Sequence, residues 1–429
     1  SIPHACPEHG QRGCARGTTG MPLPLIPLVL GLPVLAICSA VAHVTGQDWP
    51  KLRNMFYFPL GGTTRGSHHA TQRQRLLQRL GGTNLRLVTR DNRAVSAVYA
   101  EPDRPVRTDV AVILIGANAM VLDDMVEYAE FYLHRLRVPV LMLSLWGYPD
   151  PINPAIDSSA AAAEEASSSA IDGSADESAP LQPKKAKTDL SDPCPTELSV
   201  YLDCEAAYAH LVSTRNLRPD GILVHGVSIG GAVGASLAIN HPGVRMTFDQ
   251  PFCSLREVTW HMTSNVVDGF VARYLTSKGA LRTLKVVRLC VLPALSRAVA
   301  FLLVRMCFKK GLGGEEDGCA TTDMLENVAK AARIEGPVFV IYAEADEMMH
   351  PDAFRRILVA RYKLHKGEAI AKVRRHSASL EGGHMSFFGE HPEACAAYEA
   401  YLRESGFLPR SHLPGPDIAE LLVSIQGAP

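Results

Sequence analysis

The sequence has no excess of either charge, because 43 Lys and Arg residues face 44 Asp and Glu residues, for a formal net charge of −1. A chain without a basic surplus lacks the electrostatic signature of nucleic-acid binding, so nucleic acid is not an expected partner. The ten cysteines form no C-x-x-C pair, and none stands near histidines at zinc-finger spacing. The sequence therefore predicts no metal, no other cofactor, and free buried thiols in place of a disulfide framework.

Charged residues are absent from residues 21–46, an apolar segment long enough to cross a bilayer. We expect a retained membrane anchor, which the basic residues after the segment favour. The alternative is a secretory signal cleaved near Ala42, where Ala40 and Ala42 form a small-x-small site. A buried segment of a soluble domain is a third interpretation. Residues 1–20 precede a plausible start at Met21 and are expected to be a leader or a non-native segment.

Large apolar side chains are scarce between residues 151 and 195, where Ala, Ser and acidic residues dominate. Such a composition buries too little surface to offset the entropy of ordering, so the sequence predicts a disordered insertion. On both sides of it, buried apolar runs such as 110–115 alternate with helical periodicity. This alternation is typical of a doubly wound, mostly parallel α/β sheet.

Strand patterns are also missing from residues 254–335, which we interpret as a helical lid inserted into one α/β domain over 47–407. The lid contains an apolar and cationic stretch over 289–310. Packing of this stretch on the core is favoured over contact with a membrane or an acyl chain, because amphipathic helices usually pack on protein. Residues 408–429 are left as a C-terminal tail.

The stretch Gly226-Val227-Ser228-Ile229-Gly230 fits G-x-S-x-G and lies between an apolar, β-branched run and a helical pattern of small residues. A serine nucleophile on a sharp strand-to-helix turn needs small residues two positions away, because the two backbones approach closely there. The N-terminus of the helix also favours negative charge that develops nearby. We predict that Ser228 is a nucleophile; the alternative is a structural junction that contains a serine.

A nucleophilic serine needs a general base and a carboxylate that orients the base. His384 lies in the glycine-flanked loop of SLEGGHMSFF and has the best context among sixteen histidines, with His350 as its main rival. Asp346 ends the predicted strand PVFVIYAEAD, and Glu344 is the weaker alternative. Because the order Ser, Asp, His accompanies nucleophile elbows of this type, the sequence predicts a triad of Ser228, His384 and Asp346.

The oxyanion of a tetrahedral intermediate needs backbone N–H donors. One is expected from Ile229, the residue after the nucleophile. The other is expected from the loop GANAM, which follows the strand over 110–115. We favour Asn118 as the donor in this loop, with Ala117 as the alternative, because the register of the loop is open.

The motifs GANAM, LSLWGYPDP, HGVSIGG, FDQPFCSL, YAEADEMMH and EGGH occur here in the order seen in the α/β-hydrolase superfamily. Over residues 84–407 the chain most resembles α/β-hydrolase-domain proteins with a short N-terminal hydrophobic anchor. Proteins of that branch read H-G-N-A where this chain has Gly116-Ala117-Asn118-Ala119, and G-Y-G-x-S where it has Gly147-Tyr148-Pro149-Asp150. The resemblance implies an α/β-hydrolase fold with a lid; its motifs specify the superfamily and not a substrate.

Together these observations predict a serine hydrolase that acts on carboxylic esters or thioesters, with a small-molecule or lipid-like acyl substrate as its partner. The apolar lid, the segment 21–46 and the family resemblance favour an apolar acyl group. Two other functions stay open: an acyltransferase, in which an alcohol or thiol replaces water, and a non-catalytic binding or scaffold protein that keeps the fold. Retention of Ser, Asp and His in the expected order argues against the scaffold.

Overall fold

The computed structural model describes residues 76–145, 197–261, 325–364 and 375–411, with single gaps at 119, 256, 259, 351 and 385. The expected leader, the apolar segment 21–46 and the insertion 151–195 lie outside these residues, as do most of the expected lid and tail. Membrane association through 21–46 therefore stays a prediction. None of the helices in the described ranges has both the length and the apolar character that crossing a bilayer requires.

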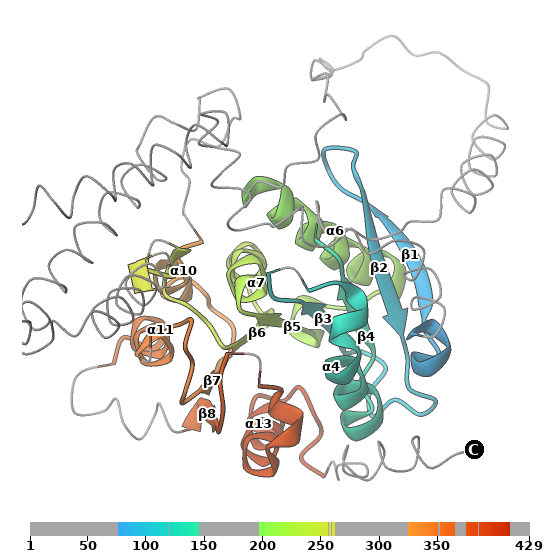
Figure 1. Ribbon diagram of the computed structural model, residues 1–429. Helices are drawn as coiled ribbons and strands as arrows, with labels where there is room; N and C mark the ends of the chain where they lie inside the picture. The colour runs from blue at the N-terminus through green and yellow to red at the C-terminus, as the bar shows by residue number, and fades with distance from the viewer. Residues whose placement is uncertain are drawn as a thin grey trace, which may run out of the picture. The chain divides into compact units, whose positions relative to one another are not determined.

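An eight-stranded sheet forms the centre of the described structure, in the order β1-β2-β4-β3-β5-β6-β7-β8 (Figure 1). The pairs β1–β2 and β2–β4 are antiparallel, and the pairs from β4 to β8 are parallel. This order, with helices on both faces, is that of the α/β-hydrolase fold. The strands are β1 (Thr83–Val88), β2 (Ala94–Ala100), β3 (Ala111–Ile115), β4 (Val140–Leu143), β5 (Ile222–Val227), β6 (Arg245–Asp249), β7 (Val338–Ala343) and β8 (Ser377–Leu380).

Strand β3 explains why the sequence shows continuous apolar runs where the sheet lies. All five of its residues are buried. Ile113 and Ile115 pack into the core cluster on one face of the sheet, and Val112 and Leu114 pack into the cluster on the other. Because side chains alternate between the faces of a strand, a strand covered on both sides must be apolar throughout.

Helices cover both faces of the sheet, as Figure 1 shows. The first core cluster includes residues of α6 (Glu197–Arg215), α7 (Ile229–Asn240), α10 (Asn327–Ala331) and α11 (Ala353–Tyr362). The second includes residues of α4 (Val126–Glu130) and α13 (Pro392–Glu404). These two layers hold the carboxyl ends of β3, β5, β6 and β7 at one edge of the sheet, where ligands bind in open α/β sheets.

The helix expected after β3 is less regular than its periodicity suggests. It consists of a 3₁₀ turn (Leu122–Met125), α4 and a π-helical turn (Phe131–Leu136). From the π-helical turn, the buried Tyr132 hydroxyl reaches His225 Nδ1 at 2.6 Å and the Tyr398 hydroxyl at 2.6 Å. His225 Nε2 in turn lies 3.2 Å from Asp249 Oδ2. A buried polar network of this kind specifies one packing arrangement, because each member needs its partners.

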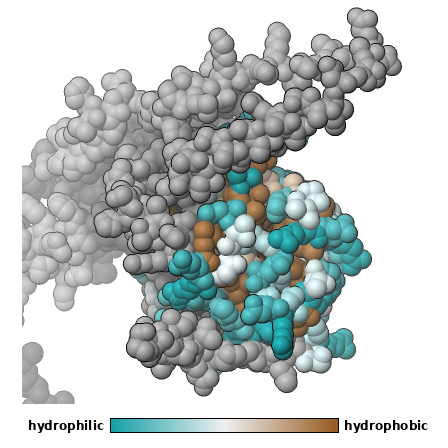
Figure 2. Space-filling model, turned by 90° about the vertical axis from the view of Figure 1, so that its right-hand side faces the viewer, coloured by the Kyte–Doolittle hydropathy of each residue, from teal (hydrophilic) through white to brown (hydrophobic). Residues whose placement is uncertain are grey.

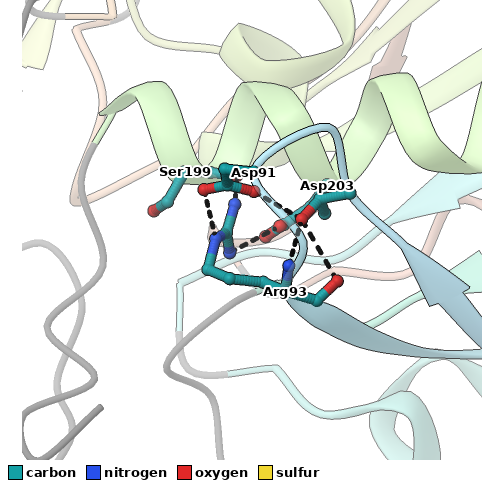
Figure 3. A network of polar contacts seen from close by, with 5 residues as sticks. Asp91, Arg93, Ser199 and Asp203 are labelled. Atoms are coloured by element: carbon teal, nitrogen blue, oxygen red, sulfur yellow. Dashed lines mark hydrogen bonds and ion pairs between the residues drawn. The ribbon is translucent and has the colours of Figure 1, made fainter. Parts of the chain in front are cut away.

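A buried ion pair attaches the β1–β2 turn to α6 (Figure 3). Arg93 lies after the turn at Asn92, whose φ of 65° is left-handed. Its Nη1 donates to Asp203 Oδ1 at 2.9 Å, its Nε to Asp91 Oδ2 at 2.7 Å, and its Nη2 to the Ser199 carbonyl at 3.0 Å. Asp203 is fully buried and Arg93 is only 8% exposed. The contact therefore lies in the interior and joins two segments that are far apart in the sequence.

The described surface in Figure 2 is mostly hydrophilic, with smaller hydrophobic areas between the polar ones. Among the described residues, Val88 and Leu198 are the large apolar side chains that are exposed. Isolated apolar residues are ordinary on a protein surface and mark no binding site.

Candidate active site

Ser228 lies on a sharp turn between β5 and α7. Its φ of 52° and ψ of −110° fall in a region that non-glycine residues rarely adopt. Such strain persists only where the surrounding structure imposes it, and it concentrates at functional sites. Ser228 takes the N-cap position of α7, yet its side chain makes no cap hydrogen bond. The hydroxyl is therefore directed elsewhere.

The two glycines of the motif are required by sterics. A Cβ on Gly226 would lie 2.2 Å from the carbonyl oxygen of Gly230. A Cβ on Gly230 would lie 2.3 Å from the carbonyl oxygen of Ile115, at the end of β3. Both separations are far inside van der Waals contact, so β5, α7 and β3 approach this closely only because glycine stands at both positions.

The His384 side chain lies within hydrogen-bond distance of the Ser228 hydroxyl. Its Nε2 lies 3.2 Å from Ser228 Oγ, and its Nδ1 lies 2.9 Å from Asp346 Oδ2. A carboxylate only accepts hydrogen bonds, so Nδ1 carries the proton and Nε2 of the neutral imidazole is free to accept from the serine. Ser228 and His384 are 5% and 3% exposed, which keeps bulk water away from this contact.

Asp346 follows β7 and is held ionised by its surroundings. Burial alone would raise the pKa of this carboxyl, but the hydrogen bond and charge of His384 lower it, and so do the backbone N–H groups of Met349 and Met348. The net effect is a pKa below the usual value. Oδ1 accepts from Met348 N at 2.9 Å and from Met349 N at 2.8 Å, which leaves Oδ2 for the imidazole.

The loop that carries His384 is fastened to the loop that carries Asp346. The Ala345 N–H donates to the Gly382 carbonyl at 3.0 Å, and the His384 N–H donates to Glu347 Oε2 at 3.2 Å. A Cβ on Gly383 would lie 2.6 Å from the same Oε2, so a larger residue there would displace the Glu347 carboxylate. Glu347 was not expected to take part, because nothing in its sequence context distinguishes it from other loop carboxylates.

The structure separates the expected triad from its sequence rivals. Glu344 is exposed at the end of β7, while Asp346 holds the imidazole. His350 is exposed, and its Nδ1 accepts the Asp352 N–H at 3.2 Å. His384 and Asp346 are thus the histidine and carboxylate that the fold brings to Ser228.

Of the expected oxyanion donors, Ile229 is the first residue of α7, directly after Ser228. In the loop after β3, the Ala117 N–H donates to the Met120 thioether at 3.1 Å. Asn118 is exposed and lines the same cavity as His384. The placement favours Asn118 over Ala117, and the role of both as donors stays a prediction.

A cavity of about 540 Å³ adjoins His384. Its lining includes apolar and aromatic residues, which are Met120, Val126, Tyr128, Val227 and Phe387. Tyr128 and Phe387 meet edge to face, with ring centroids 4.7 Å apart. The lining also includes polar and charged residues, which are Arg79, Asn118, Asp123, Asp124 and Glu127. Apart from Asn118 and His384, the lining residues were not expected from the sequence, because they come from separate segments. Within the described ranges, no three His, Cys, Asp or Glu residues are grouped as metal ligands.

No protein-family model matches the chain, and no curated protein sequence does. An esterase of Pyrococcus furiosus is similar over 76% of this chain and 92% of its own, with 12% identity and a TM-score of 0.41. An α/β-hydrolase of Vibrio vulnificus covers 83% and 91%, with 13% identity and a TM-score of 0.40. An acylaminoacyl peptidase of Pyrococcus horikoshii covers 80% of this chain but 44% of its own, with 11% identity and a TM-score of 0.39. Similarity at this level says nothing about activity. The α/β-hydrolase fold of this chain follows from its own strand order and from the turn between β5 and α7.

Proposed function

We propose that the protein is a serine hydrolase that cleaves carboxylic ester or thioester bonds through an acyl-enzyme. One observation supports this above all: Asp346, His384 and Ser228 form a continuous chain of hydrogen bonds, with the serine on a strained turn. The Ser228 hydroxyl faces an oriented imidazole and does not cap the helix. This is the geometry of an activated nucleophile.

In the proposed reaction, Ser228 Oγ attacks the substrate carbonyl carbon while His384 Nε2 takes its proton. The N–H groups of Ile229 and Asn118 stabilise the oxyanion of the tetrahedral intermediate. Its collapse breaks the bond to the alcohol or thiol, which leaves with the proton from His384. Water then attacks the acyl group, gives one proton to His384, and releases the carboxylic acid as the proton returns to Ser228. Asp346 stays ionised throughout and stabilises the imidazolium.

Labelling with a fluorophosphonate tests this proposal, because the probe reacts with activated serines. The full chain is expected to take up the probe at one site, and Ser228→Ala is expected to lose the label completely. Ser254→Ala is the matched control, since Ser254 is also buried after a strand but its Oγ accepts the Glu257 N–H. A folded wild-type chain that stays unlabelled, or a Ser228→Ala variant that labels normally, contradicts the proposal.

The cavity beside His384 supports a neutral, apolar acyl group as the preferred substrate. Its aromatic and aliphatic wall can bury hydrocarbon. Its lining also carries three carboxylates, from Asp123, Asp124 and Glu127. Arg79 lines the same cavity, and its Nη2 donates to the buried Glu130 at 2.7 Å.

We therefore expect the enzyme to discriminate against acyl groups that end in a carboxylate. The value of kcat/KM for 4-nitrophenyl hemiadipate should be at least about fivefold below that for 4-nitrophenyl hexanoate, since even in water a like charge 4 Å away costs about 1 kcal/mol. Glu127→Gln should narrow this ratio, and Glu404→Gln, at the C-terminal end of α13 and outside the cavity lining, should leave it unchanged. Equal rates for the two esters in the wild type would show that the acidic wall does not face the acyl group.

A further inference from the structure

Gln250 directly follows β6 and is 1% exposed. Its φ of 48° lies in the left-handed region, where a residue other than glycine, asparagine or aspartate is uncommon. A backbone of this kind is costly and persists where surrounding contacts fix it. The contacts of Gln250 and of its neighbour Asp249 show what is fixed here.

The backbone of this dipeptide connects the serine turn to the strand that leads to the acid. The Asp249 carbonyl accepts the Ser228 N–H at 2.8 Å. The Gln250 N–H donates to the Ile341 carbonyl in β7 at 2.8 Å. Asp249 is fully buried, and its carboxylate also lies 3.2 Å from His225 below the turn. The left-handed turn at Gln250 therefore sets the position of Ser228 relative to β7.

The side chain of Gln250 reaches the third catalytic segment. Its Nε2 donates to the Ser386 carbonyl at 2.6 Å, and Ser386 lies two residues after His384. The Ser386 N–H closes a turn on the Gly383 carbonyl at 3.1 Å, so the bond from Gln250 holds the turn that contains His384. The same loop is also fastened to the loop of Asp346, through the Ala345 N–H on the Gly382 carbonyl and the His384 N–H on Glu347 Oε2.

The amide of Gln250 is used as a donor. Its orientation follows from the partner, because the Ser386 carbonyl only accepts hydrogen bonds. The other amide atom, Oε1, is buried and has no hydrogen-bond partner among the described residues. Because Oε1 has no partner among the described residues, the favourable polar contact of this side chain is the bond from Nε2 to the His384 loop.

We propose that Gln250 is a positioning residue that fixes His384 Nε2 relative to Ser228 Oγ. The inference rests on the proposed serine hydrolase function, because it gives Gln250 a role in that proton transfer. Ser228 and His384 are joined at 3.2 Å, the outer end of the range for such a transfer. A displacement of about 1 Å at a reacting centre can cost about 100-fold in rate. Gln250 does not line the cavity beside His384, so it should affect the rate and not substrate binding.

Gln250→Met tests the proposal, because it keeps the length of the side chain and removes the donor. With 4-nitrophenyl butyrate, kcat is expected to fall between about 10-fold and 100-fold, while KM stays within about twofold. Gln250→Glu is a second variant, in which a carboxylate oxygen faces the Ser386 carbonyl, and the same loss of kcat is expected. If one of these two variants does not fold, the other serves as the test.

Asn327→Leu is the matched control. Asn327 is also fully buried, its Nδ2 donates to the Phe252 carbonyl at 2.8 Å, and its Oδ1 also has no hydrogen-bond partner in the described part of the chain. The control thus removes the same kind of bond, from a buried amide to a backbone carbonyl, but its acceptor is Phe252 and not the His384 loop. Its kcat is expected to stay within about twofold of wild type. Equal losses of kcat in Gln250→Met and Asn327→Leu would overturn the proposal.

Amide hydrogen exchange of residues 381–387 provides a readout that does not need activity. Exchange in this loop is expected to become roughly tenfold faster in Gln250→Met and to stay unchanged in Asn327→Leu, because only the first variant releases the loop. A wild type that neither hydrolyses the ester nor labels with fluorophosphonate would overturn the hydrolase function, and the exchange result would then decide the positioning role alone. Unchanged exchange together with unchanged kcat in Gln250→Met would overturn the role of Gln250.

Discussion

Replacing Asp346 with asparagine is expected to lower kcat by about 10⁴-fold while the chain stays folded. The size of this effect is that found when the carboxylate of a serine–histidine–aspartate triad becomes an amide. The substitution changes one oxygen to nitrogen and keeps the shape of the side chain. The loss therefore comes from the direction of the hydrogen bonds and not from packing.

The contacts of Asp346 determine that direction. Oδ1 accepts the N–H groups of Met348 and Met349, so the amide oxygen of an asparagine must take this place. Its NH₂ group then faces His384 Nδ1, where Oδ2 now lies at 2.9 Å. To avoid two donors meeting, the imidazole carries its proton on Nε2 and can no longer accept one from Ser228.

Steady-state hydrolysis of 4-nitrophenyl butyrate by Asp346→Asn checks this prediction, with thermal unfolding as the test of folding. Glu344→Gln is the matched control, because Glu344 is an exposed carboxylate at the end of the same strand. Its kcat should equal that of the wild type. A loss of less than tenfold in Asp346→Asn, or an equal loss in Glu344→Gln, would mean that Asp346 does not set the tautomer of His384.

The elbow could be predicted from sequence because the residues that its sharp turn requires lie within five positions of one another. Gly226 and Gly230 are fixed by contacts among β5, α7 and the end of β3, and the G-x-S-x-G spacing records these contacts within five residues. The buried strands were equally accessible, since a strand such as β3 that is covered on both faces must be apolar throughout. His384 could be selected because glycines before it and aromatic residues after it mark a loop that lies against the core.

The remaining parts of the site depend on tertiary contacts that leave no local pattern. Strand β8 has only four residues, Ser377–Leu380, and its small and polar side chains resemble a loop. Helix α11 was not distinguished from the loop after β7. Gln250 contacts Ser386, which lies 136 residues further along the chain, and nothing near Gln250 in the sequence indicates that contact. Loop carboxylates such as Glu347 acquire a role only when two loops meet.

The second large effect is expected at the buried ion pair between the β1–β2 turn and α6. Arg93→Met should lower the free energy of unfolding by about 3–5 kcal/mol, because it takes the guanidinium away from a carboxylate that is fully buried. The hydrogen bond to the Ser199 carbonyl and the ion pair with Asp91 are lost with it (Figure 3). Chemical denaturation followed by circular dichroism measures the change.

An exposed pair of the same type is the control. Arg218 and Asp220 lie 2.7 Å apart, but their side chains are 77% and 52% exposed, so Arg218→Met should cost less than about 1 kcal/mol. The double variant Arg93→Met, Asp203→Leu should regain a large part of the loss, because it removes the buried charge together with its partner. Equal losses of unfolding free energy in Arg93→Met and Arg218→Met, or no recovery in the double variant, would contradict the prediction. Arg93 would then stabilise the fold by something other than pairing with the buried Asp203 charge.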